Sequence, residues 1–348
     1  MASKAFWNYA ELRPHMGAFP VPEEFSTWYE LPNNLEEELR NYLPNGKELE
    51  ALEWSKFERV LSSALFAAHM TVQYSNPAYH NLRHFVEIVE AGKELLDGYE
   101  ELTSNRVPRL FSWLSSKSEH ATKLISRLYA KRAPKKIDDA IKQAFLFALA
   151  FHDCGHSGCT FRSMSTEPEK LFRSEEGMDV STEYVSMIEA DAQAKLLGFN
   201  PAARLFISYI IASSTYGVGT EEGKRIGISH IAPKDLFGRF VMLADVCPKS
   251  TMSAAAFDGS AVNVAETPAT GKSKNFEALV NGQSGFYGYI ESNMDKVDEQ
   301  AGVPLTQYLG WRRALSNSKS RVTSIGTSTM EGAVNGAIFE SVYRSFAE

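Results

Sequence analysis

The spacing of apolar residues constrains this chain more than any other feature of its sequence. From Asn34 onward, apolar side chains recur at intervals of three and four residues, which is the period of an amphipathic helix. No convincing run of alternating apolar and polar residues, the pattern of a half-buried strand, interrupts this spacing. The helices that it predicts cover residues 35–43, 48–74, 82–99, 107–131, 136–153, 181–198, 201–214, 233–249, 276–299 and 304–317. The sequence therefore predicts an all-α fold.

Regions that lack this spacing suggest how the chain is organised. The first 33 residues hold four prolines among aromatic residues, which indicates an irregular arm laid over a core. Residues 157–180 and 250–275 are long and polar or rich in small residues, a feature of functional or disordered loops. Residues 325–332 resemble a hinge before a last short helix. We predict an N-terminal arm and helix packed on the core over 1–50, a main domain over 51–320, and a hinge with a C-terminal helix over 321–348.

Composition excludes several classes of protein. With 44 % hydrophobic and 23 % charged residues, the chain has the composition of a soluble globular protein. A net charge of −7 argues against a nucleic-acid partner, and three cysteines do not make a disulfide framework. The start of the chain lacks the apolar core of a secretory signal, and the longest apolar stretch, 205–218, is too short to span a bilayer. We therefore expect a cytoplasmic protein without a membrane partner; a homodimer remains open.

Histidines gather at two places in the sequence. Four of the eight fall in the strings YHNLRH, residues 79–84, and HDCGH, residues 152–156. In each string two histidines are four residues apart, the spacing that places side chains on one face of a helix. The helix predicted before the second string has an apolar face that leads directly into His152 and Asp153. A buried imidazole beside a carboxylate needs a partner, and a divalent metal ion is one. Histidines that merely form hydrogen bonds at helix ends are the alternative.

The two strings together resemble the HD-domain metal-dependent phosphohydrolases. Within that superfamily, the chain looks most like the class I 3′,5′-cyclic-nucleotide phosphodiesterases, whose strings are YHNxxH and HDxxHPG. The resemblance extends over about residues 60–315 and implies a compact multi-helix bundle, with 51–320 as the catalytic domain. It implies that His84, His152 and Asp153 bind metal. The superfamily's further aspartate, on a later helix, is matched by Asp245 at the end of the apolar run FVMLAD.

The resemblance also implies roles for residues around the metal. His80 matches the histidine that acts as general acid, protonating the leaving oxygen. Glu183 and Glu189 are candidates for orienting that histidine. His156 would form a hydrogen bond with a metal-bound water or with a ligand carboxylate. The string that reads HAxD in the family departs from it here, since Phe85 follows His84.

The resemblance further implies a nucleotide substrate and two metal ions. The string QSGF is similar to the family's QxGF, in which Gln283 would read the purine edge and Phe286 would stack on the base. Two imidazoles and two carboxylates suit Zn²⁺, Fe²⁺ or Mn²⁺ at the tighter site. Asp153 would bridge to a second ion, Mg²⁺ or Mn²⁺, held mostly by water. The predicted activity is two-metal hydrolysis of cAMP or cGMP, small-molecule nucleotides, to the 5′-monophosphate.

Other functions share part of this pattern. A nucleotidase or a deoxynucleoside triphosphate hydrolase of the HD type would use the same ligands with a basic phosphate site, and the basic residues nearby are few: Arg83 and Arg162. HD-type di-iron oxygenases, like the cyclic-dinucleotide branch, use added histidines, and only His230 lies between His156 and Asp245. A non-catalytic nucleotide-binding HD module is the remaining alternative. Such a module would be expected to lose a ligand, and all four ligand positions are filled here.

Overall fold

The structure is a computed structural model in which only part of the chain is described. The described residues are 38–39, 41–42, 46–72, 82–104, 136–154, 179–180, 182–214, 225–226, 233, 235–246, 276–325 and 327–347. The predicted helix over 107–131, the predicted arm over the first 33 residues and the loop over 250–275 lie outside them.

Helices dominate the described part of the chain, which confirms the predicted all-α class. After a single 3₁₀ turn, η2 (Gly46–Glu48), the α-helices of this part are α3 (Trp54–Val72), α4 (Leu82–Thr103), α7 (Asp139–Phe151), α9 (Thr182–Leu197), α10 (Pro201–Ser214), α11 (Leu236–Val246), α14 (Phe276–Ala301), α15 (Leu305–Tyr308), α16 (Trp311–Ser324) and α17 (Met330–Ala347). The sheet within the described ranges is a parallel pair of two-residue strands, β1 (Asp179–Val180) and β2 (Arg225–Ile226).

Three predicted helix boundaries differ most from the structure. The helix predicted over 304–317 is two helices, because Gly310 adopts a φ of +76°, a left-handed conformation that ends one helix and precedes the next. The helix predicted over 48–74 begins only at Trp54. The backbone of Leu52 is instead bound by the side chain of Gln143, which accepts from its N–H at 2.7 Å and donates to its carbonyl at 2.8 Å. The last helix is not short: α17 has 18 residues and begins inside the predicted hinge.

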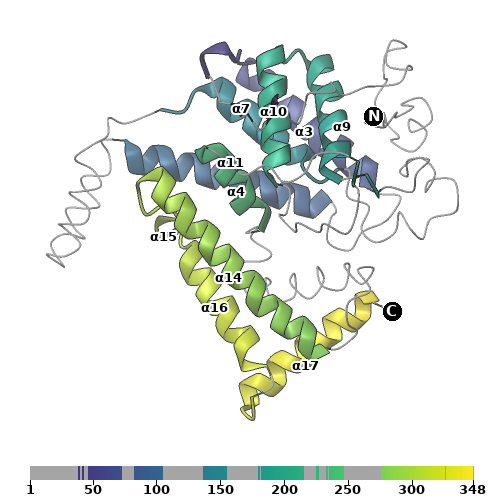
Figure 1. Ribbon diagram of the computed structural model, residues 1–348, viewed down its shortest axis with the longest axis vertical. Helices are drawn as coiled ribbons and strands as arrows, with labels where there is room; N and C mark the ends of the chain where they lie inside the picture. Colours follow the sequence, from purple (N-terminus) through teal and green to yellow (C-terminus); the bar gives the residue numbers. More distant parts are fainter. Residues whose placement is uncertain are drawn as a thin grey trace, which may run out of the picture.

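Helices α3, α4, α9 and α10 pack against α7 in the upper group of helices of Figure 1, and α11 contacts it through the rings of Phe237 and Phe240. The residues of α7 from Gln143 to Phe151 are all buried, so the helix has no solvent-facing side over about its last two and a half turns. A helix that is apolar all round is typical of the middle of a large core. In the described part of the chain, no helix is both long enough and apolar enough to cross a membrane.

Helices α4 and α7 approach each other closely, and this contact positions the candidate site. A Cβ atom at Gly92 of α4 would collide with the side chain of Leu149 of α7, and would also lie 3.2 Å from the ring of Phe145. Glycine therefore allows the two helices to come closer than any other residue would at this position. Near the other end of α7, Glu100 of α4 accepts hydrogen bonds from the backbone of Ile137 and from Lys142. The two helices are thus in contact near both ends of α7.

Helices α14, α16 and α17 form an arm that extends away from this bundle (Figure 1). Ion pairs join α14 to α16: Lys319 contacts Glu291 at 2.9 Å, and Arg312 contacts both Asp295 and Asp298. The end of α14 nearest the bundle lies along α11, where Arg239 donates to Gln300. The arm is therefore fixed to the helix that carries Asp245.

Asp235 caps the beginning of α11. Its Oδ1 atom accepts hydrogen bonds from the backbone N–H of Gly238 at 2.8 Å and from the hydroxyl of Tyr209 at 2.9 Å. Its Oδ2 atom is buried without a hydrogen-bond partner among the described residues. Burial raises the pKa of Asp235 above its usual value, although the hydrogen bonds from Gly238 and Tyr209 act in the opposite direction.

This raised pKa predicts how stability depends on pH. The unfolded carboxyl group ionises from about pH 4, while the folded one holds its proton to a higher pH, so raising the pH destabilises the folded protein. Asparagine at this position keeps an oxygen acceptor and does not ionise. We therefore expect the unfolding free energy of Asp235→Asn, relative to that of the parent, to increase as the pH is raised from about 4 to 7. Urea denaturation of both proteins across this range measures the difference. A constant difference would contradict the assignment.

Candidate metal centre

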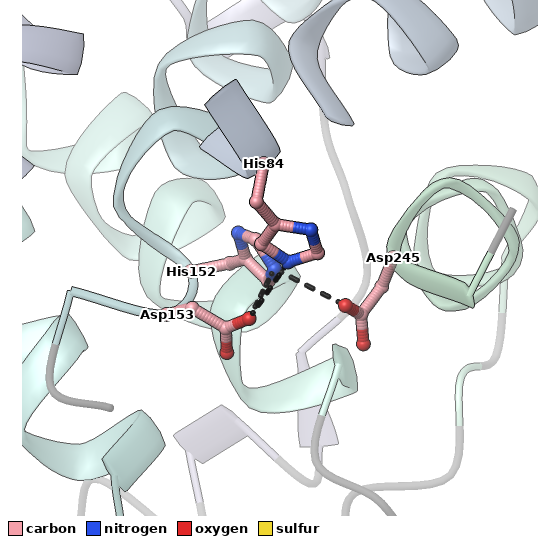
Figure 2. Close-up of side chains that lie close together, drawn as sticks. All are labelled: His84, His152, Asp153 and Asp245. Atoms are coloured by element: carbon pink, nitrogen blue, oxygen red, sulfur yellow. Dashed lines mark hydrogen bonds and ion pairs between the residues drawn. The ribbon is translucent and has the colours of Figure 1, made fainter. Parts of the chain in front are cut away.

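Three helices place four side chains around one point (Figure 2). His84 is the third residue of α4, and His152 and Asp153 follow directly after the last residue of α7. Asp245 is the residue before the last in α11. The ends of three packed helices therefore meet at these four residues, which are the four that the sequence predicted as metal ligands.

The four side chains are close enough to share an ion. One potential ligand atom of each residue lies within 4.8 Å of all the others. Nε2 of His152 is 2.9 Å from Oδ2 of Asp153 and 3.2 Å from Oδ1 of Asp245, and Nε2 of His84 is 3.4 Å from the same Oδ2 of Asp153. The histidine side chains are 3 % and 0 % exposed, and those of Asp153 and Asp245 are 15 % and 25 % exposed. The cluster is thus buried on its histidine side and partly open on its carboxylate side.

A backbone contact fixes the protonation of one imidazole. Nδ1 of His152 lies 2.8 Å from the carbonyl oxygen of Leu149, which can only accept a hydrogen bond, so Nδ1 carries a hydrogen. Nε2 then faces the two carboxylates. Burial acts to lower the pKa of His152, but the charges and hydrogen bonds of Asp153 and Asp245 outweigh it and raise that pKa well above its ordinary value. The carboxylates therefore favour a proton on Nε2, and a metal ion bound there in place of that proton would also offset their negative charge.

The donor set fits a metal ion. Two imidazole nitrogens and two carboxylate oxygens suit Zn²⁺ and similar divalent ions, which bind such atoms at about 2.0–2.2 Å. Ligands at these distances are about 3.4 Å apart around a tetrahedral ion and up to about 4.2 Å apart around an octahedral one. A pair at the 4.8 Å limit of the cluster would therefore have to approach to bind one ion. A Nδ1–H hydrogen bond to a backbone carbonyl, as His152 has, is a common support for a metal-binding imidazole. The four residues can therefore bind a metal ion.

The other predicted site residues are less well placed by the structure. His80 and His156 lie outside the described residues, and the side chain of Gln283, on α14, is also not described. Phe286 is half-buried and packs against the core. Glu189 of α9 is buried and accepts a hydrogen bond from Gln193 at 2.9 Å. The predicted roles of these residues stay predictions.

The sequence did not predict two groups that support the imidazole of His152. The carbonyl of Leu149 orients His152, and the ring of Phe85 packs against the same imidazole. A carbonyl has no sequence signature, although its position three residues before a helix-end histidine could have suggested it. The contact of Phe85 depends on how α4 crosses α7, and nothing in the local sequence of either helix reports that crossing.

Comparison of the chain with protein-family models, with curated proteins and with solved structures finds no match. The resemblance of its short strings to the HD-domain phosphohydrolases therefore remains an interpretation of the sequence. The clustering of His84, His152, Asp153 and Asp245 is the independent structural observation that bears on it.

Removal of one carboxylate should abolish metal binding. Asp245→Asn keeps the size of the side chain but removes a charged ligand, so we expect its affinity for Zn²⁺ or Mn²⁺ to fall more than about 100-fold. At a metal concentration of 100 times the dissociation constant, the parent should gain about 2.7 kcal/mol of unfolding free energy, and the variant should gain almost none. Metal analysis after equilibrium dialysis and thermal denaturation with and without metal measure both effects.

Asp191→Asn provides the control for this experiment. Asp191 is also a buried aspartate, but it forms its ion pair with Arg204, between α9 and α10. Its loss should reduce stability and leave metal affinity unchanged. Equal metal binding by the parent and by Asp245→Asn would show that Asp245 is not a ligand, and absence of metal binding by the parent would show that the cluster is only a hydrogen-bonded group.

Proposed function

We propose that the protein is a metal-dependent phosphodiesterase that hydrolyses a 3′,5′-cyclic nucleotide to its 5′-monophosphate with two divalent ions. The observation that carries the proposal is the convergence of His84, His152, Asp153 and Asp245 from three helices. Residues separated by as many as 161 positions, such as His84 and Asp245, meet in one partly open cluster. A group of this kind that served the core alone would bury two carboxylates and two imidazoles at considerable cost.

The proposed chemistry divides between the metal and the chain. When bound, the ions supply an activated water and neutralise charge on the phosphate. His84, His152 and Asp245 would hold the tighter ion, Zn²⁺, Fe²⁺ or Mn²⁺, and Asp153 would be shared with a second ion, Mg²⁺ or Mn²⁺. His80 would donate the proton that the O3′ leaving oxygen needs. The Leu149 carbonyl keeps Nε2 of His152 directed at the cluster.

Electrostatics favour a substrate with little negative charge. Asp153 and Asp245 are on the more exposed side of the cluster, which is where a substrate would approach. Arg83, the basic residue next to His84, is paired with Glu87 at 2.8 Å. Triphosphates carry several charges and generally need a basic site, whereas a cyclic phosphodiester carries one. Gln283 and Phe286 of α14 would recognise the base.

The test is hydrolysis of cAMP and cGMP by the purified protein with Mn²⁺ or Mg²⁺, with metal content measured on the same sample. We expect turnover with about two metal ions per chain. In the variant His80→Ala, we expect turnover to fall by about 10²–10⁴-fold, the contribution of a general acid, while the metal content stays that of the parent. Asp245→Asn should lose both.

Two results would contradict the proposal. Bound metal without turnover of either cyclic nucleotide would exclude this substrate class and favour hydrolysis of another phosphoester. Absence of both metal and turnover would favour a module that binds nucleotides without catalysis. A His80→Ala protein that had lost its metal would show that this residue is a ligand rather than the acid.

Gln283→Ala should weaken nucleotide binding selectively. Loss of one or two hydrogen bonds to a base edge is worth about 1.4 kcal/mol, so we expect KM to rise about tenfold with metal content unchanged. Gln307→Ala, at an exposed position of α15, is the matched control and should behave as the parent. An unchanged KM for Gln283→Ala would remove this residue from the site.

A further inference from the structure

An aromatic ring packs directly against one of the metal-binding candidates. Phe85 follows His84 in α4 and is fully buried. Its ring centroid lies 6.4 Å from that of His152, and the two ring planes meet at 85°. The imidazole of His84 lies 6.0 Å from that of His152 on a tilted plane. Phe85 and His84, neighbours in sequence, therefore both contact the His152 ring.

The imidazole of His152 is fully buried, and polar contacts hold it at both nitrogen atoms, with Asp153 and Asp245 on the Nε2 side. Its Nδ1 atom donates to the carbonyl of Leu149, which holds one edge of the ring. Contacts at the nitrogen atoms leave the ring some tilt about its bond to Cβ, because the torsion of an imidazole about that bond is broad. The perpendicular ring of Phe85 limits this tilt by occupying the neighbouring space. Nε2 is consequently kept in the direction of Asp153 and Asp245.

We infer that Phe85 is a positioning residue of the metal centre, an inference that rests on the proposed metal binding. Its ring holds the imidazole of His152 at the angle that metal coordination requires, and it excludes water from the buried side of the cluster. Metal affinity depends on such outer groups, whose loss commonly weakens binding by about 10–100-fold. Exclusion of water also strengthens the attraction between the carboxylates and a cation.

A core phenylalanine without this role is available for comparison. Phe206 of α10 is also fully buried, and its ring packs against Tyr209 and Phe237 at 6.5 and 5.9 Å. Truncation of either phenylalanine to leucine removes a similar buried ring and should lower the melting temperature by a similar amount. Only truncation of Phe85 should change the metal centre.

The experiment compares Phe85→Leu with Phe206→Leu in the full chain, using Zn²⁺ as the probe. Zinc affinity is measured by competition with a chromophoric chelator, well below the melting temperature of each variant. We expect Phe85→Leu to bind zinc about tenfold more weakly than the parent, and Phe206→Leu to bind it equally well. The visible spectrum of bound Co²⁺, which reports coordination geometry, should change only in Phe85→Leu.

Equal zinc affinities and equal Co²⁺ spectra in the two variants would overturn the inference, since Phe85 would then contribute to the core alone. If Phe85→Leu does not fold, Phe85→Met decides the question, because methionine fills most of the same space without a rigid ring. A parent protein that binds no zinc would instead contradict the metal centre itself. The two failures are therefore distinguishable.

Discussion

The structure depends on the burial of α7 on every side. Helices α3, α4, α9 and α10 pack around it and α11 contacts it through aromatic rings, so its last turn ends inside the protein rather than at the surface. The first residue beyond it, His152, is fully buried as a result. A buried helix end leaves carbonyl groups to be satisfied, and Nδ1 of His152 satisfies that of Leu149. The packing of the bundle thus buries the hydrogen-bonded pair of His152 and the Leu149 carbonyl, next to which the candidate site lies.

The same packing decides which helices can contribute to that point. Gly92 lets α4 approach α7 closely, which brings the first turn of α4, with His84, to the end of α7. Helix α11 begins at the Asp235 cap and carries Asp245 in its last turn, and α14 lies along it. The site therefore receives His84 from α4, His152 and Asp153 from the end of α7, and Asp245 from α11. The packing of these helices sets their relative positions.

Much of the fold could be predicted from the sequence, because helix formation follows local spacing. The predicted bounds of α9 and α10 lie within one residue of the observed ones, since apolar periodicity and the Gly198–Pro201 signal act within a few residues. The boundaries that differed depend on distant contacts or on backbone conformation. The start of α3 depends on Gln143, 91 residues from Leu52, and the break at Gly310 on a positive φ.

In the candidate site, too, local features could be predicted from the sequence and features that depend on tertiary packing could not. The i, i+4 histidines and the adjacent aspartate were visible as residue types, and the four predicted ligands do converge. The supporting groups were not visible, because the carbonyl of Leu149 and the ring of Phe85 act through the crossing of two helices. A local pattern can indicate which atoms would bind an ion. The orientation of those atoms is determined by the tertiary packing, which a single sequence does not state.

Charge balance explains why such a cluster can persist in a buried place. Two carboxylates beside two neutral imidazoles would leave net negative charge at a site that is largely removed from water, which is costly. The pKa of His152 is raised because a proton on Nε2 offsets part of this charge, with Asp153 and Asp245 as its partners. A divalent ion at the same point would offset more of it. A proton on Nε2 of His152 and a divalent ion are therefore alternative occupants of the same position. The fold is compatible with either, because the negative charge of Asp153 and Asp245 balances the positive charge of both.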